Sequence, residues 1–232
     1  IRFSTEDTAN DDALTVGLED VLLAQSDEKI YMDFDTNERV ETPSVMINNT
    51  PAESVEARDS DTTGKSWRAT YTVPGDLSSD VTSVNFTITN FNDPAGNINS
   101  LAVISGDESA VSQSVKIDVE KPTLEDSSIL FLTENTLNDD ALTLGLENTL
   151  LAKSGEKIYM DFDTNERVQT PTVTINNSEL SSTDVVMREG DQTGKFWRAT
   201  YTVPSDLSSD VASVNFSITN FNDPAGNINT HD

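Results

Sequence analysis

Acidic side chains gather at two places in this sequence, and each place occurs twice. One gathering lies at the end of a short apolar run and comprises Asp33, Asp35 and Glu38 in the first copy and Asp161, Asp163 and Glu166 in the second. The other is the hexapeptide NDPAGN, which carries Asp93 in the first copy and Asp223 in the second. Ionised carboxylates held within a few ångströms of one another repel strongly unless a cation lies among them. Oxygen ligands of this kind suit Ca²⁺, so calcium binding is the chemistry to consider first.

The duplication covers most of the chain. The segment EKIYMDFDTNERV occurs at 28–40 and again at 156–168, and ITNFNDPAGNIN occurs at 88–99 and again at 218–229. The offset is 128 residues at Asp33 (161 − 33) but 130 at Trp67 (197 − 67), so the second copy has two additional residues before its tryptophan. Loops accept insertions more readily than strands, so a loop is expected at this place. We predict two domains, 1–119 and 120–232.

Apolar and polar residues alternate over short runs, which is the pattern of strands with one buried face. Four such runs occur in the first copy and return in the second: 29–35, 44–47, 67–73 and 84–88. Trp67 shares a face with Ala69 and Tyr71, which favours core packing over a sugar-stacking role. Only 15–25 could be helical, and it is expected to be a loop with at most one turn. The pattern predicts an all-β fold with one antiparallel sandwich per copy.

Five motifs follow one another along the first copy: A-x-S-x-EKIYMDFDTNE (24–38), TP-x-V-x-I (42–47), W-x-A-x-Y-x-V (67–73), NDPAGN (92–97) and IDVEKPT (117–123). In this order they resemble the bacterial Ig-like domains repeated in large surface adhesins, although Asn37 replaces the serine usual before the acidic residue. The resemblance implies tandem Ig-like antiparallel β-sandwiches from a secreted or cell-surface protein. It also implies neighbouring repeats of the same long chain as partners, and calcium at the junctions that stiffens the array.

In an Ig sandwich the loops after the second and sixth strands lie at the same end, so the acidic gatherings are expected to converge. The linker into the second copy begins at that end too. We predict a Ca²⁺ site at the junction, with ligands drawn from Asp118, Glu120, Asp161, Asp163, Glu166, Asp223, Asp33, Asp35, Glu38 and Asp93. The alternative is that these residues only shape turns, with Pro94 presetting φ and Gly96 supplying a positive φ.

Paired carboxylates also occur in glycosidases, and Asp33 and Asp35 lie about 7 Å apart on one face of their strand. The pair recurs in both copies with no aromatic platform nearby, so no catalytic residue is predicted. The one histidine, His231, excludes a Ser-His-Asp triad. Two alternative functions stay open: a module that binds a glycan or surface ligand through its repeated loops, and an accessory domain of a secreted hydrolase.

The 232 residues include 41 acidic and 14 basic side chains, a formal net charge of −27, and no cysteine. This charge disfavours nucleic acid and anionic membranes as partners, and the lack of cysteine excludes disulfides and thiolate metal sites. No apolar run approaches the roughly 20 residues of a transmembrane helix, so no membrane insertion is expected. The acidic stretches 10–12 and 138–140, with Glu19 and Glu147, are expected to be solvated loops.

Residues 101–119 are expected to form a final hairpin of the first copy. The second copy reaches Asp232 after its NDPAGN loop and before any counterpart of that hairpin. One edge of the second sandwich is therefore expected to be bare, covered by a neighbouring molecule, or closed by residues from elsewhere in the chain.

Overall fold

The computed structural model describes residues 1–7, 21–58, 61–99, 103–104, 114–134, 150–206, 211 and 213–229. Contacts divide the chain into two units: unit 1 comprises Ile1–Glu120 and Pro224–Gly226, and unit 2 comprises Lys121–Asp223 and Asn227–Asp232. In the described part of the chain, no helix is long and apolar enough to cross a membrane. The acidic stretches near residues 10–12 and 138–140, with Glu19 and Glu147, lie outside the described residues, as does His231.

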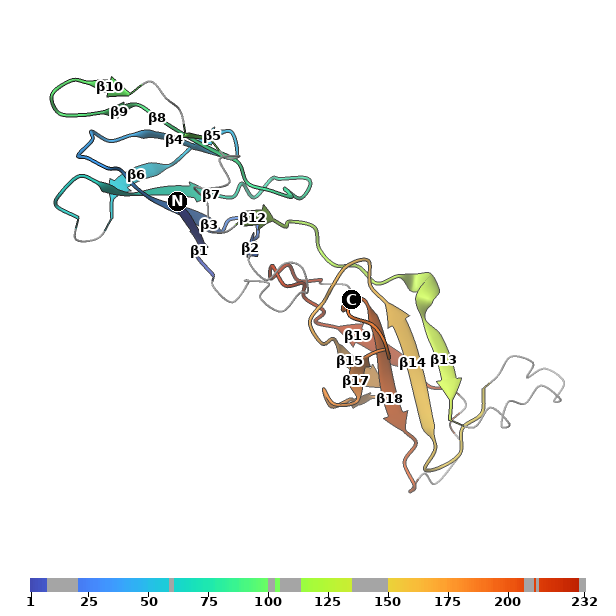
Figure 1. Cartoon of the computed structure of the whole chain (residues 1–232). Helices are drawn as coiled ribbons and strands as arrows, with labels where there is room; N and C mark the ends of the chain where they lie inside the picture. Colours follow the sequence, from blue (N-terminus) through green and yellow to red (C-terminus); the bar gives the residue numbers. More distant parts are fainter. Residues whose placement is uncertain are drawn as a thin grey trace. The chain divides into compact units, whose positions relative to one another are not determined.

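Unit 1 consists of short strands, labelled in Figure 1. They are β1 (Arg2–Thr5), β2 (Val21–Ala24), β3 (Lys29–Asp35), β4 (Ser44–Ile47), β5 (Thr50–Pro51), β6 (Ser54–Ala57), β7 (Ser66–Thr72), β8 (Phe86–Thr89), β9 (Phe91–Asn92), β10 (Ile98–Asn99), β11 (Val103–Ile104) and β12 (Ser114–Ile117). One sheet has the order β1-β3-β7-β6 and another has the order β11-β8-β4-β5. In addition, β12 pairs with β2, and β10 pairs with β9.

The described residues of unit 2 repeat the two main sheets of unit 1, apart from a counterpart of β11. The strands are β13 (Leu130–Thr133), β14 (Lys157–Asp163), β15 (Thr172–Ile175), β16 (Ser178–Glu179), β17 (Val185–Met187), β18 (Phe196–Thr202) and β19 (Phe216–Thr219). A short 3-10 helix, η2 (Asp126–Ser128), precedes β13. The sheets have the orders β13-β14-β18-β17 and β16-β15-β19. The predicted all-β fold of two antiparallel β-sandwiches is therefore confirmed.

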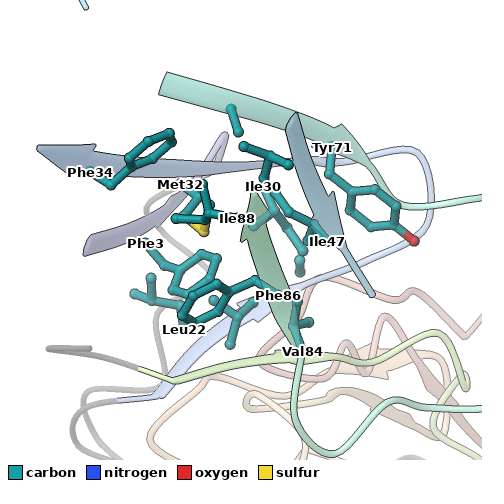
Figure 2. Close-up of a cluster of buried hydrophobic side chains, with 14 of the residues drawn as sticks. Phe3, Leu22, Ile30, Met32, Phe34, Ile47, Tyr71, Val84, Phe86 and Ile88 are labelled. Carbon is teal, nitrogen blue, oxygen red and sulfur yellow. The ribbon is translucent and has the colours of Figure 1, made fainter. Parts of the chain in front are cut away.

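The centre of each unit is a pair of long antiparallel strands that alternate between core and surface. In unit 1, β3 and β7 place Ile30 opposite Tyr71, Met32 opposite Ala69 and Phe34 opposite Trp67. All six side chains are buried, and Figure 2 shows the three from β3 in one cluster with Phe86 and Ile88 of the facing sheet. Burial of each large apolar side chain stabilises the fold by about 1.5–3 kcal/mol.

The same register joins β14 and β18 in unit 2, and that unit has its own core around Met160 and Phe162. The tryptophans of the two units, Trp67 and Trp197, are 7% and 4% exposed. The alternation pattern thus predicted their core packing correctly.

Asparagine pairs turn the chain between neighbouring strands. Asn48 and Asn49 follow β4 with φ of 49° and 60°, and Asn176 and Asn177 follow β15 with φ of 51° and 60°. Two successive positive φ values are typical of the two-residue hairpin turn that matches the twist of antiparallel strands, and asparagine tolerates them better than most residues. After the turn in unit 2, the two additional residues lie in the loop 180–184, between β16 and β17, as the insertion predicted.

Two sequence predictions were wrong. Residues 21–24, expected in a loop, form β2, whose Leu22 and Leu23 are both 5% exposed. A strand buried on both faces has a continuous apolar run rather than alternation, which hides it from pattern analysis. Residues 101–119 contribute strands to different sheets instead of a hairpin, because β11 pairs antiparallel with β8 while β12 pairs parallel with β2.

Equivalent phenylalanines of the two units differ in burial, and this difference gives a test of the packing. We expect Phe86→Ala to lower the free energy of unfolding of unit 1 by about 3–5 kcal/mol, as for a buried Phe. The same change at Phe216 should cost unit 2 less than half as much, because Phe216 is 40% exposed and Phe86 is 2% exposed. Urea denaturation followed by tryptophan fluorescence measures both, with Trp197→Phe or Trp67→Phe isolating each unit's signal. If Phe86→Ala and Phe216→Ala lower the free energy of unfolding equally, the burial difference is contradicted.

Candidate metal centre

Both copies of the NDPAGN loop are held by their own side chains. In unit 1, the backbone N–H and the side-chain amide of Asn97 donate to the two carboxylate oxygens of Asp93 at 2.8 and 2.6 Å. In unit 2, Asn227 makes the same two bonds to Asp223, both at 2.8 Å. The side-chain bond from Asn97, with the backbone bond from the same residue, lowers the pKa of Asp93. Turn formation therefore accounts for part of what these aspartates do.

The two copies differ in how deeply this loop is buried. Asp223 is 0% exposed and Asn227 is 7% exposed, whereas Asp93 is half-buried and Asn97 is exposed. Glu166 is half-buried, and its counterpart Glu38 is exposed. Carboxylate oxygens of Glu166 and Asp223 lie within 4.8 Å of each other. Unit 2 thus brings together one acid from each predicted gathering, in surroundings less hydrated than those of the unit 1 counterparts.

Backbone hydrogen bonds hold the two acid-bearing segments of each unit together. Glu41 N donates to Asn92 O at 2.8 Å in unit 1, and Gln169 N donates to Asn222 O at 2.7 Å in unit 2. The side-chain oxygens Oδ1 of Asn92 and of Asn222 are buried and have no hydrogen-bond partner among the described residues. A buried amide oxygen without a donor is costly, and a cation is one group that satisfies it.

The segment that enters unit 2 lies against the same end of that unit. Thr123 and Asn165 exchange two hydrogen bonds, at 2.6 and 3.0 Å, and Leu124 forms a bridge with Thr164. The side-chain amide of Asn229 donates to Pro122 O. The partners in unit 2 lie within two residues of Glu166 or of the NDPAGN loop in the sequence. The entry of the chain into unit 2 is therefore fixed beside both acidic segments.

Asp118 and Glu120 lie in unit 1 directly after β12. Asp118 N donates to Ala24 O at 2.9 Å, and the backbone N–H groups of Val119 and Glu120 donate to Asp80 Oδ1 at 3.0 and 3.2 Å. Both carboxylates belong to unit 1, whereas Glu166 and Asp223 belong to unit 2. Their participation in one metal site stays a prediction.

Arginines supply the counter-charge for the aspartates on the long strands of unit 1. Arg68 Nε and Nη2 donate to the two oxygens of Asp33 at 2.7 and 2.9 Å, and Arg68 lies over the ring of Tyr31 at 5.2 Å. Arg58 Nη2 donates to Asp35 at 3.1 Å. These ion pairs offset the repulsion that motivated a cation at Asp33 and Asp35.

Unit 2 repeats this arrangement with a more buried acid. Arg198 Nε and Nη2 donate to Asp161 at 2.7 and 2.8 Å, and Asp161 is 5% exposed. Arg188 donates to Asp163 and lies 3.9 Å from Asp161. Asp161 and Asp163 thus have cationic partners, and we leave them out of the metal site proposed below.

These arginines were not predicted from the sequence, because each bonds to an aspartate on a neighbouring strand. Arg68 lies opposite Asp33 in the register of β3 and β7, and Arg198 lies opposite Asp161 in that of β14 and β18. The available signal was the recurrence of both residues, in both copies, on the outward faces of two predicted strands.

A second missed feature is an aspartate that organises the loop before each tryptophan strand. Asp191 accepts hydrogen bonds from the backbone N–H and hydroxyl of Thr193 and from the backbone N–H groups of Gly194 and Phe196. In unit 1, Asp61 accepts hydrogen bonds from the backbone N–H and hydroxyl of Thr63 and from the backbone N–H groups of Lys65 and Ser66. The hydroxyl of Thr63, followed by the backbone donors, lowers the pKa of Asp61. Burial acts to raise the pKa of Asp191, but the hydrogen bonds outweigh it and the pKa is lowered.

Comparisons with known proteins add little to this description. No protein-family model matches the sequence, and the comparison with curated proteins gave no match. Among solved structures, the chain is similar to fibronectin(III)-like modules of Clostridium thermocellum CbhA, with 10% sequence identity and a TM-score of 0.31, over 96% of this chain and 87% of that chain. The fold assignment rests on the strands and sheets described above.

The loop aspartates predict a specific dependence of stability on pH. Asp191→Asn should lower the free energy of unfolding of unit 2 by about 1 kcal/mol at neutral pH, because an amide nitrogen would face the N–H donors of Gly194 and Phe196. A folded-state pKa below the unfolded value stabilises the fold above about pH 3.9, and this contribution disappears as pH falls through the folded-state pKa.

The difference in free energy of unfolding between wild type and Asp191→Asn should therefore be constant above about pH 5 and shrink toward pH 2. Urea titrations at several pH values, read from Trp197, measure it. Asp61→Asn is the matched variant for unit 1. A difference that grows on acidification would contradict the assigned role.

Proposed function

We propose that this chain is a structural repeat of a secreted or cell-surface adhesin and acts as a spacer whose junction is stiffened by calcium. Its role is mechanical and spatial, and none of its residues is assigned to catalysis. Tandem repetition of the same central strand pairs, with the same registers and the same arginine pairs, supports a function that depends on length and rigidity. Neighbouring repeats of the same long chain would be its partners.

The observation that carries the calcium proposal is the closeness of Glu166 and Asp223. Their carboxylate oxygens lie within 4.8 Å of each other, and Asp223 is wholly buried. Asn222, the residue before Asp223 in the sequence, adds a buried amide oxygen. A donor set of carboxylate and amide oxygens, without nitrogen or sulfur, fits Ca²⁺ rather than zinc or copper. When bound, the ion would neutralise the two acids and tie together the two segments that carry them.

The linker can supply further oxygens in this proposal. Pro122 is fixed to unit 2 by Asn229, and Asp118 precedes it by four residues (122 − 118). In this proposal Asp118 and Glu120 bind the same ion, because four residues of extended chain span at most about 14 Å and keep both acids within that distance of Pro122. A ligand from the linker would couple metal binding to the angle at which the chain enters unit 2, which is how calcium would limit bending.

Calorimetric titration of the whole chain with Ca²⁺ tests the proposal. We expect saturable binding with a dissociation constant of about 10⁻⁴–10⁻³ M, the range of extracellular modules. At 100 times the dissociation constant, calcium should raise the free energy of unfolding of unit 2 by about 2.7 kcal/mol, and EGTA should reverse the gain. No heat of binding and an unchanged melting midpoint would exclude calcium from the function.

The duplication supplies matched controls. Glu166→Gln and Asp223→Asn should each weaken calcium binding at least about tenfold, because each removes a charged ligand. Glu38→Gln and Asp93→Asn make the same changes in unit 1 and should leave that affinity unchanged. Asp118→Asn separates the two parts of the proposal: weakened binding places the linker in the site, and unchanged binding confines the ion to unit 2. If the unit 1 variants weaken calcium binding as much as the unit 2 variants do, a site at the junction is contradicted.

A further inference from the structure

Strand β12 completes unit 1 by lying between two other segments. It pairs in parallel with β2, with Val115 opposite Leu22 and Ile117 opposite Ala24. On its other side it bonds to the segment before β8: Val84 N donates to Val115 O at 2.8 Å, and Ile117 forms an antiparallel bridge with Val81. Val115 and Ile117 are each 1% exposed, so β12 covers the core with both apolar side chains.

Unit 2 has nearly the same receiving segments in sequence. Residues 21–24 read VLLA and 149–152 read TLLA, while 81–86 read VTSVNF and 211–216 read VASVNF. Among the described residues of unit 2, however, no strand pairs with 150–152 or with 211 and 213–215. Strand β19 pairs with β15, whereas its counterpart β8 pairs with both β4 and β11.

Equivalent side chains are more exposed in unit 2, where no described strand takes the place of β12. Leu22 and Leu23 are both 5% exposed, whereas Leu150 and Leu151 are 39% and 40% exposed. Val211 is 44% exposed, and Val84, which is 6% exposed in unit 1, has the half-buried counterpart Val214. The apolar side chains of 150–152, Val211 and Val214 are therefore partly exposed at positions whose unit 1 counterparts lie beside β12, and we call these residues the acceptor edge.

We infer that the acceptor edge of unit 2 binds an extended segment from outside this unit that has the chemistry of β12, with β-branched apolar side chains at alternate positions. Unit 1 shows what such a segment contacts when it is in place. Its backbone would run parallel to 150–152 and satisfy the N–H and C=O groups on both sides. Its two apolar side chains would cover Leu150 and Val214, as Val115 and Ile117 cover the core of unit 1.

The geometry disfavours a second copy of the chain as the occupant. Two copies joined by a twofold axis would set their equivalent segments antiparallel, whereas β12 runs parallel to β2. A swapped β12 would have to leave its own unit, where Val115 and Ile117 are buried. A separate extended segment meets neither obstacle.

A synthetic peptide of residues 111–120 (VSQSVKIDVE) tests the inference on the whole chain. Fluorescence anisotropy of the labelled peptide should show saturable binding below about 1 mM. Hydrogen exchange should slow at 150–152 and 211–216 in unit 2 and stay unchanged at 21–24 and 81–86, where β12 already lies. A peptide with aspartate replacing both apolar residues, at the positions of Val115 and Ile117, should not bind.

Variants of the chain locate the site. Leu150→Asp and Val211→Asp should each weaken peptide binding at least about tenfold, because both place a charge on the acceptor edge. Val186→Asp changes an apolar side chain that is 46% exposed on β17, away from this edge, and should retain binding within about twofold. Circular dichroism and Trp197 fluorescence verify folding, and the use of two edge variants keeps the test decisive if one misfolds.

Three results would overturn the inference. One is a lack of binding at 1 mM peptide. Another is binding that neither edge variant weakens. The third is a concentration-dependent dimer in sedimentation velocity that protects the same segments and that the peptide does not displace, because a second copy would then be the occupant.

Discussion

The pairing of two long antiparallel strands is the constraint on which each unit depends. Once β3 and β7 are in register, the alternation of the backbone places Met32 and Ala69 in the core and Asp33 and Arg68 on the outer face. A shift of one residue would exchange the two faces and bury the ion pair instead of the apolar side chains. Core packing and surface charge pairing therefore select the same register, in both units.

That register also separates the acids of this chain into two groups. The aspartates on the long strands face arginines across the sheet, and their charge is offset within each unit. Glu166 and Asp223 lie beyond the ends of β14 and β19, outside the strand registers that place arginines opposite aspartates. A strongly acidic sequence can thus hold the aspartates of its long strands in ion pairs while two other acids of unit 2, Glu166 and Asp223, lie close together at one end of the sandwich.

The sequence predicted the strands that have one solvent-exposed face and missed β2, in which Leu22 and Leu23 are both buried. Alternation identified β3, β7 and their repeats, because half-buried strands have a period of two residues. The run VLLA of β2 lacks that period, and the different partners of β11 and β12 depend on tertiary packing that no local pattern contains. Composition and spacing located the acidic segments, but the arginine partners depend on which residues face each other across strands.

Near-identity of the two units has a consequence for how the chain reaches its fold. Strands β3 and β14 have the same seven residues, and β7 differs from β18 only at Ser66, where β18 has Phe196. Pairing of β3 with β18 would bury the same side chains and form the same arginine bonds as the native partner. Refolding of the denatured chain is thus open to misassembly between repeats, whereas synthesis from the amino end lets the first sandwich close before its competitor strand exists.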